Sequence, residues 1–274
     1  MPNGYTGQIL HIDLSNRNIT IEKPPAEFYR RYLGGSALNL YYLLREIPAR
    51  ADPLCPENVL GLSVGVTTGT AISGNSRVTV SAKSPLTGAI GDSQAGGFWP
   101  ATLKWAGFDG IIIKGRASSP VYLWIHEGKA ELKDAAHLWG KITGETEALI
   151  KSELGDPKVQ ILQIGPAGEQ MVRYACLISM CSRAAGPTGM GAAMGSKNLK
   201  AVVVEGNRKP RLADKFFTTP LTGGLTHGKC MDREEVENAV IEYYRQRDWD
   251  PTSGRPTREA LEQLELGWVA DLLD

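Results

Sequence analysis

The stretch VLGLSVGVTTGTAISGNSRVTVSAK, residues 59–83, decides the fold class of this chain. Residues 59–66 and 77–83 are rich in Val and alternate in polarity, which is typical of β-strands. A loop of small residues, 67–76, joins the two segments. The segments on either side of this stretch indicate what kind of sheet these strands enter.

The N-terminal side predicts a hairpin followed by a helix. Residues 7–22 alternate in polarity on both sides of the polar turn SNRN, and Pro24-Pro25 ends the second strand. Leucine and isoleucine recur at i, i+3, i+4 and i+7 in the segment 36–47, so we expect a helix with one buried face there, which ends at Pro48.

The C-terminal side predicts further strands and helices in irregular order. We expect a hairpin over 121–134 that turns at Glu127-Gly128, while 173–180 is ambiguous between strand and helix. The other expected elements are a loop 84–97, a helix 98–106, a strand 110–115, a helix 143–154, a strand 159–165, a loop 182–198 and a strand 199–206. Because the elements do not alternate as in a doubly wound fold, we predict an α+β domain with mixed β-sheets over residues 1–206.

The character of the sequence changes after Gly206. Residues 207–231 form a linker that is first basic and then rich in Gly, Thr and Pro. Residues 232–274 form a helical tail, with helices expected over 232–247 and 256–266. A tail this short cannot build a stable core alone, so we expect it to pack on the main domain or on a partner.

Composition excludes several classes of protein. The chain has 274 residues, with 30 Lys and Arg against 30 Asp and Glu. A net charge of zero argues against a nucleic-acid partner, and no apolar run is long enough to cross a membrane. No secretory signal is visible, so a cytoplasmic location is expected. The four cysteines form no CxxC pair and no HExxH or GxSxG motif occurs, so the sequence predicts no metal ligands and identifies no catalytic residue.

Three loops share a composition that suits an anionic ligand. They are 73–77, 92–97 and 183–189, and each combines Gly, Ala or Ser with a polar or cationic side chain. Small residues let backbone N–H groups approach phosphate oxygens, and arginine binds such oxygens in pairs. A ligand with phosphates and a flat heterocycle would suit them. The alternative is that these are ordinary turns, since no segment matches a P-loop and the GxGxxG-like string at Gly189 has Met194 at its third glycine position.

The ordered motifs resemble the N-terminal domain of the aldehyde ferredoxin oxidoreductases, which contain tungsten or molybdenum. The resemblance covers almost all of residues 4–206. The pieces that carry it are GYTG (4–7), LCPEN (54–58), KSPLTG (83–88), AGGF (95–98), KWAGFDGIII (104–113), PVYLW (120–124), HLWGK (137–141), IGPAGE (164–169) and RAAG with GAAMGSKNLKAVVVEG (183–206). Residues 242–250 and 256–266 are similar to the C-terminal end of the same family.

The resemblance implies a specific fold and cofactor. It implies two related β-rich halves that form a saddle, on which two pyranopterin-dithiolenes hold tungsten or molybdenum while a magnesium ion bridges their phosphates. The implied cofactor-binding residues are Arg77, Gln94, Gly96, Arg183, Ala184 and Gly186. The family commonly has Asn at the position of Gln94 and Arg at that of Pro187, and both changes would re-aim phosphate contacts.

Two functions are compatible with these observations. Family members carry helical domains with the cysteines of a [4Fe–4S] cluster and the substrate pocket, and this sequence shows neither after Gly206. The first hypothesis is the cofactor-binding portion of an oxidoreductase that acts on aldehyde or oxo groups with a ferredoxin-type acceptor. On this hypothesis the chain is inactive alone and is either a truncated product or one subunit whose partner chain supplies the rest. The second is a non-catalytic scaffold or cofactor-handling subunit. The second hypothesis also predicts an exposed apolar patch that favours self-association or binds a partner.

Overall fold

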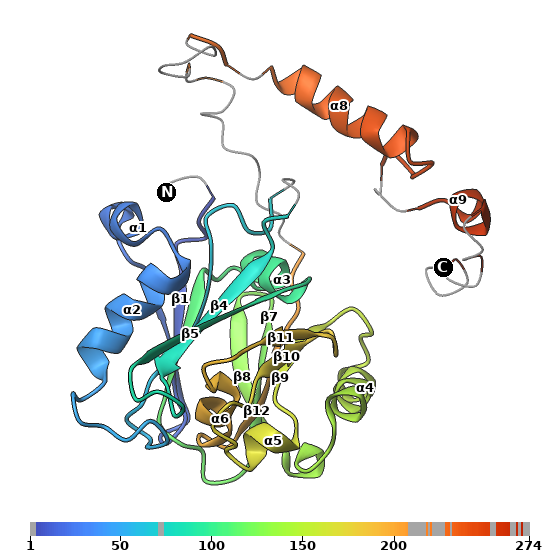
Figure 1. Ribbon diagram of the computed structural model, residues 1–274. Coiled ribbons are helices and arrows are strands. Elements are labelled where there is room, and N and C mark those ends of the chain that lie inside the picture. The colour runs from blue at the N-terminus through green and yellow to red at the C-terminus, as the bar shows by residue number, and fades with distance from the viewer. Residues whose placement is uncertain are drawn as a thin grey trace. The chain divides into compact units, whose positions relative to one another are not determined.

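Figure 1 shows the computed structural model of the chain. It describes residues 4–70, 74–207, 218, 220, 228–230, 232–252, 256–263, 267 and 270. Most of the predicted linker 207–231, and Ser73 of the first small-residue loop, lie outside the described residues. Two compact units make up the chain, Met1–Leu212 and Ala213–Asp274.

The first half of unit 1 is a six-stranded mixed sheet. Its elements are β1 (Ile9–Asp13), β2 (Asn18–Glu22), α1 (Ala26–Tyr32), α2 (Gly35–Glu46), β3 (Leu60–Val64), β4 (Arg77–Lys83), β5 (Ile90–Gly96), α3 (Trp99–Trp105) and β6 (Gly110–Lys114). The strand order is β2-β1-β6-β3-β4-β5. Only the pair β1 and β6 is parallel in this sheet.

The second half repeats this topology. Its elements are β7 (Val121–His126), β8 (Lys129–Asp134), a 3₁₀ turn (Ala136–Leu138), α4 (Thr143–Leu154), β9 (Gln160–Gln163), α5 (Pro166–Glu169), β10 (Leu177–Ser179), β11 (Arg183–Ala185), α6 (Met190–Gly195) and β12 (Leu199–Val204). Its order, from the β8 edge, is β8-β7-β12-β9-β10-β11, and only β7 and β12 run parallel. The α+β fold with two related mixed-sheet halves is therefore confirmed.

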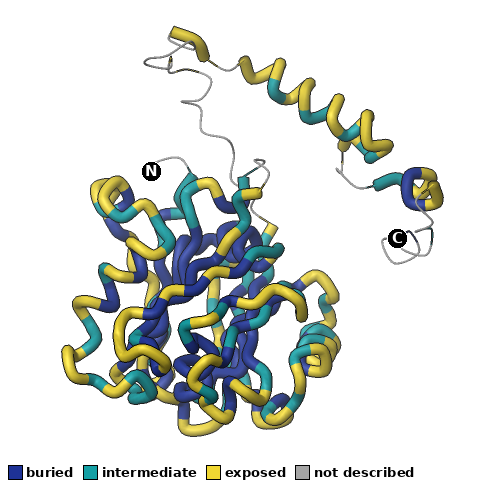
Figure 2. Tube along the Cα trace, in the orientation of Figure 1, coloured by how far each residue is buried: buried dark blue, intermediate teal, exposed yellow. Residues whose placement is uncertain are grey.

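The main core lies between the two sheets. Successive side chains of a strand point to opposite faces of the sheet. One set of side chains therefore packs between the sheets, and the other set packs against a covering helix. On β1, Leu10 joins the shared core while Ile9 packs with α2, and on β12 Val202 and Val203 divide in the same way between the shared core and α4. Trp99 at the start of α3 is fully buried and donates its Nε1 proton to the Val202 carbonyl at 2.8 Å. Figure 2 shows the resulting buried strands within an exposed outer layer.

The predicted loop 84–97 is wrong in its second part, because residues 90–96 form β5. This strand pairs with β4 along its whole length, from Lys83 opposite Ile90 to Arg77 opposite Gly96. Its inward residues are Gly91, Ser93 and Ala95, so the alternation is between small and polar side chains and lacks the apolar signal of an ordinary strand.

The predicted loop 182–198 is also wrong in part. It contains β11 and α6, both built from small residues. The ambiguous segment 173–180 contributes the short strand β10, and α1 was not predicted. The predicted hairpins over 7–22 and 121–134, the helices of α2, α3 and α4, and the strands of β3, β4, β6, β9 and β12 are confirmed.

The described residues of unit 2 include the helices α8 (Arg233–Arg245) and α9 (Arg258–Gln263). Asp232 caps α8, since its carboxylate accepts the Glu235 N–H at 2.9 Å. The end of the second predicted helix, 264–266, lies outside the described residues. Over the described part of the chain, no helix has the length and apolar character that crossing a membrane requires.

Candidate functional site

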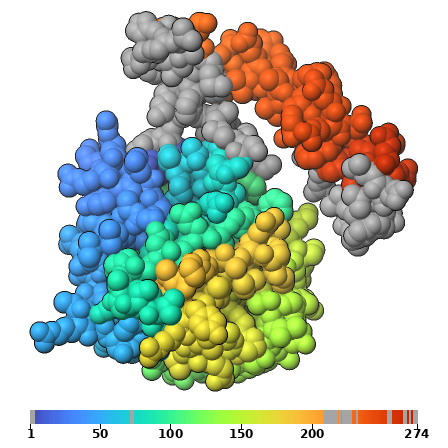
Figure 3. Space-filling view, in the orientation of Figure 1, coloured from blue at the N-terminus to red at the C-terminus, as the bar shows by residue number. Residues whose placement is uncertain are grey.

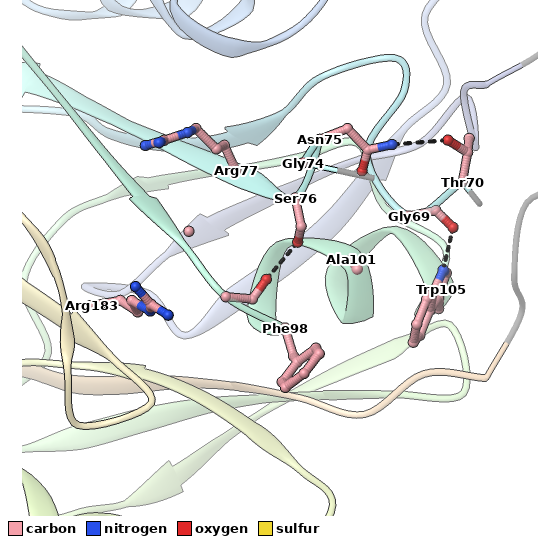
Figure 4. Close-up of a pocket in the computed structure, with 12 residues that line it drawn as sticks. Gly69, Thr70, Gly74, Asn75, Ser76, Arg77, Phe98, Ala101, Trp105 and Arg183 are labelled. Atoms are coloured by element: carbon pink, nitrogen blue, oxygen red, sulfur yellow. Dashed lines mark hydrogen bonds between the residues drawn. The ribbon is translucent and has the colours of Figure 1, made fainter. Parts of the chain in front are cut away.

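A hollow of about 400 Å³ lies where the two halves of unit 1 meet. Its lining includes three of the six residues expected at the site, namely Arg77, Gly96 and Arg183. Arg77 and Gly96 come from the first half and face each other across β4 and β5, while Arg183 opens β11 in the second half. Two of the three small-residue loops, together with the described part of the third, therefore meet at one hollow (Figure 4).

The edge strands β5 and β11 bring the two halves together. They lie side by side, and Figure 3 shows the β4–β5 and β10–β11 segments in contact on one face. Thr188 fixes this seam, because its hydroxyl lies 2.7 Å from the Ser93 hydroxyl and its carbonyl accepts the Ser84 hydroxyl at 2.7 Å. The position of Arg183 relative to Arg77 is thus set by hydrogen bonds between the halves.

The two guanidinium groups form the cationic end of the hollow. Both residues are exposed, and no ion pair joins either one to a carboxylate among the residues that the structure describes. Exposed arginines without a partner attract anions, and a pair of them matches the oxygens of a phosphate. This end of the hollow therefore suits a phosphate group.

Glycines make the floor of the hollow accessible to a ligand. Gly97 has φ +111°, and a Cβ atom there would lie 2.8 Å from Met180 Sδ. Gly69 has φ +81°, and a Cβ atom there would lie 2.9 Å from Trp105 Nε1. Both positions require glycine, so the hollow is bordered there by backbone without a side chain.

Hydrogen bonds hold the rim formed by the loop after β3. Asn75 donates its side-chain amide to Thr70 Oγ1 at 3.1 Å, and Trp105 donates its Nε1 proton to the Gly69 carbonyl at 2.9 Å. Ser76 donates its hydroxyl to the Gly97 carbonyl. The rim of the hollow is therefore tied both to α3 and to the turn after β5 (Figure 4).

The other three expected residues lie outside this hollow. Gln94 is exposed on β5 opposite Thr79, and Ala184 is exposed on β11 opposite Ile178. Gly186 follows β11, where a Cβ atom would lie 2.4 Å from Cys176 Sγ. Gln94 and Ala184 thus lie on the neighbouring edge strands, and Gly186 allows the chain to pass Cys176.

The three predicted loops leave out five residues of the hollow. Gly69 and Thr70 lie in the loop after β3. Phe98, Ala101 and Trp105 belong to the turn into α3 and to α3 itself, and large aromatic residues in a helix are more often core residues. The only available signal was the pair Gly96-Gly97 directly before them, which marks a tight turn at the end of a strand.

Each half contains one buried ion pair that serves the fold. Lys104 bonds to Asp109 at 2.6 Å, and Asp109 also accepts the Gly7 N–H at 2.7 Å, just before β1. In the second half Lys200 on β12 is paired with Glu169 on α5. All four side chains are at most 1% exposed. Burial lowers the pKa of Lys104, which the charge of Asp109 opposes.

The cysteines form no disulfide. Cys55, Cys176, Cys181 and Cys230 are free. Burial, with a further contribution from the hydrogen bond to Glu147, raises the pKa of Cys181 to about 11. Across the part of the chain that the structure describes, no three His, Cys, Asp or Glu side chains form a group that could hold a metal ion.

Comparisons with known proteins agree with this geometry. The family profile described as "Aldehyde ferredoxin oxidoreductase, N-terminal domain" matches residues 9–206, and the profile for domains 2 and 3 of the same enzymes matches residues 197–266. The chain belongs to the aldehyde ferredoxin oxidoreductase family. The suspected family relationship is thereby confirmed.

Relatives of known name extend the comparison. This family member is 47% identical over 236 residues to a tungsten-containing aldehyde ferredoxin oxidoreductase of Pyrococcus abyssi, and that match covers 85% of this chain and 37% of the relative. It is 34% identical over 227 residues to the WOR-like subunit of an aliphatic sulfonate oxidoreductase of Pyrococcus furiosus, covering 77% of this chain and 36% of that subunit. The chain thus spans about a third of the length of these relatives.

A solved structure has the same fold. In the active-site complex BamBC of benzoyl coenzyme A reductase with 1,5-dienoyl-CoA, one chain matches with a TM-score of 0.77 and 36% identity. The match covers 90% of the aldehyde ferredoxin oxidoreductase family member described here and 36% of the BamBC chain.

Proposed function

We propose that unit 1 binds the phosphate-bearing pyranopterin cofactor of a tungsten or molybdenum oxidoreductase. The observation that carries the proposal is the convergence of Arg77 and Arg183, one from each half, on a single glycine-lined hollow. The residues fit such a group because two cations without carboxylate partners, in the described part of the chain, meet backbone that Gly96 and Gly97 leave open.

The roles of the chain's own residues follow from their positions. Arg77 and Arg183 bind phosphate oxygens and hold the two halves in register around them. Gly96 lets the ligand approach the end of β5. We propose Gln94 and Ala184 as further contacts on the exposed faces of β5 and β11, and Gly186 as the residue that lets the chain pass behind them. The magnesium ion between the phosphates stays a prediction.

The bound cofactor would supply the two-electron chemistry that converts an aldehyde to a carboxylic acid. The chain contributes binding and orientation to that activity. We propose that helical domains on a partner chain complete the pocket, carry the [4Fe–4S] cluster and deliver electrons to a ferredoxin-type acceptor. Self-association and a cytoplasmic location stay predictions.

Pterin analysis tests the proposal. The chain is expressed with tungstate, alone and together with a chain that carries the proposed helical domains, and pterin is measured by fluorescence after denaturation. We expect pterin with the wild type and its loss in the double variant Arg77→Ala/Arg183→Ala. Arg30→Ala, an exposed cation on α1 outside the hollow, is the matched control. Pterin-free wild type in both settings would refute the proposal and favour the non-catalytic scaffold.

A further inference from the structure

Phe98 exposes an aromatic ring to the hollow. Its side chain is 61% exposed although its neighbour Trp99 is fully buried. Phe98 lines the hollow together with Arg77 and Arg183, and Figure 4 shows its ring at the start of α3 between Arg183 and Trp105. An apolar ring at a concave surface is the kind of side chain that a ligand covers.

The backbone of Phe98 is fixed from three sides. Its N–H donates to Met180 Sδ at 3.4 Å, which ties it to the second half. Its carbonyl accepts the Thr102 N–H at 2.9 Å and the Thr102 hydroxyl at 3.0 Å. The preceding Gly97 has a φ that only glycine adopts easily, so the turn that projects residue 98 is specified by the sequence. The ring is therefore exposed by a rigid turn.

The hollow has two chemically different ends. Arg77 and Arg183 supply the cationic end, and Phe98, Ala101 and Trp105 supply the apolar end, next to the amide of Asn75. A phosphate alone would use only the first end. A flat heterocycle joined to a phosphate would use both, since the guanidinium groups bind the phosphate and an aromatic face binds the ring.

We propose that Phe98 is a positioning residue that stacks on the heterocycle of the ligand whose phosphate Arg77 and Arg183 hold. The inference rests on the proposed function and adds the ring-binding group to it. Stacking fixes the plane of the heterocycle, whereas the arginines fix the position of the phosphate. Phe98 then makes the site bind a ring-bearing phosphate more tightly than inorganic phosphate.

Binding of 6-hydroxymethylpterin monophosphate to the full chain tests the proposal. The dissociation constant is measured from the anisotropy of pterin fluorescence, and inorganic phosphate is measured as a competitor. Because an aromatic partner stabilises a stacked ring, Phe98→Ala should weaken binding of the pterin about tenfold and leave competition by phosphate unchanged. Phe98→Trp should retain binding, and Phe98→Leu, which keeps apolar bulk and loses the flat face, should bind several-fold more weakly.

Controls separate this inference from the proposed function. Tyr174→Ala removes an aromatic residue that is 67% exposed and lies outside the hollow, so it should change neither constant. If Arg77→Ala/Arg183→Ala weakens both pterin and phosphate while Phe98→Ala changes neither, the stacking proposal is overturned and the phosphate site stands. Wild-type binding by Phe98→Leu would also overturn it. If the arginine variant changes nothing, the proposed function itself fails.

Discussion

Gly97→Ala should destabilise unit 1 by about 3 kcal/mol, well above an ordinary glycine replacement. Two costs combine at this position. The φ of +111° lies outside even the left-handed helical region, which costs an alanine about 2 kcal/mol. The new Cβ atom would also lie 2.8 Å from Met180 Sδ, and moving Met180 removes the acceptor of the Phe98 N–H. Displacing a packed side chain in this way adds about 1 kcal/mol.

Gly88→Ala is the matched control for this variant. Gly88 has φ +74° and nothing within 4 Å of a built Cβ atom, so its replacement carries only a backbone cost of about 1 kcal/mol. In a thermal melt, a unit of this size loses about 2–4 °C for each kcal/mol, which predicts a fall of about 6–12 °C for Gly97→Ala and about 2–4 °C for Gly88→Ala. Adding Met180→Ala to Gly97→Ala should cost less than the sum of the two single variants. Equal melting temperatures for Gly97→Ala and Gly88→Ala would refute the reasoning.

Three further predictions concern ionisable groups. Burial lowers the pKa of Lys197 from 10.5 to about 8. Between these pH values the unfolded chain therefore binds more protons than the folded chain, so the free energy of unfolding should rise with pH by up to about 3 kcal/mol. Urea unfolding across this range measures the rise, which should disappear in Lys197→Met. Asp109→Asn leaves the ammonium of Lys104 buried without its carboxylate partner and should lower the free energy of unfolding, measured in urea, by about 3–5 kcal/mol. Iodoacetamide should label Cys181 slowly at pH 8, because its pKa is about 11, and Glu147→Gln should speed the labelling. Mass spectrometry of the Cys181 peptide measures both rates. Equal labelling rates in the wild type and in Glu147→Gln would contradict the contribution of Glu147 to the raised pKa.

The strands and helices that the sequence predicted correctly are those whose buried faces carry large apolar side chains. Alternation of Ile and Leu located β1, and the i, i+3, i+4, i+7 spacing located α2. The strand β5 was missed because Gly91, Ser93 and Ala95 fill its buried positions, and small residues give no hydrophobic period. Only pairing with β4 makes this segment a strand, and single-sequence patterns do not show such pairing.

The candidate site could be predicted in its arginines and its small-residue loops, but not in its aromatic part. Arg77 and Arg183 stand out in sequence because they adjoin small residues, and the structure brings both to one hollow. The place of Phe98 and Trp105 in the same hollow depends on the turn at Gly97 and on the contact between halves at Met180. Since that contact joins residues more than 80 positions apart, nothing local in the sequence reports it.

The internal repeat has a consequence for any attempt to divide unit 1. The two sheets are joined by one short connection, from Lys114 at the end of β6 to Val121 at the start of β7. A cut there would leave each fragment with a complete six-stranded topology. Neither fragment would hold a competent pocket, because one would carry Arg77 with the glycine floor and the other Arg183. Anion binding by a mixture of the two fragments would therefore report that they have reassociated, because the bound anion would contact an arginine from each fragment.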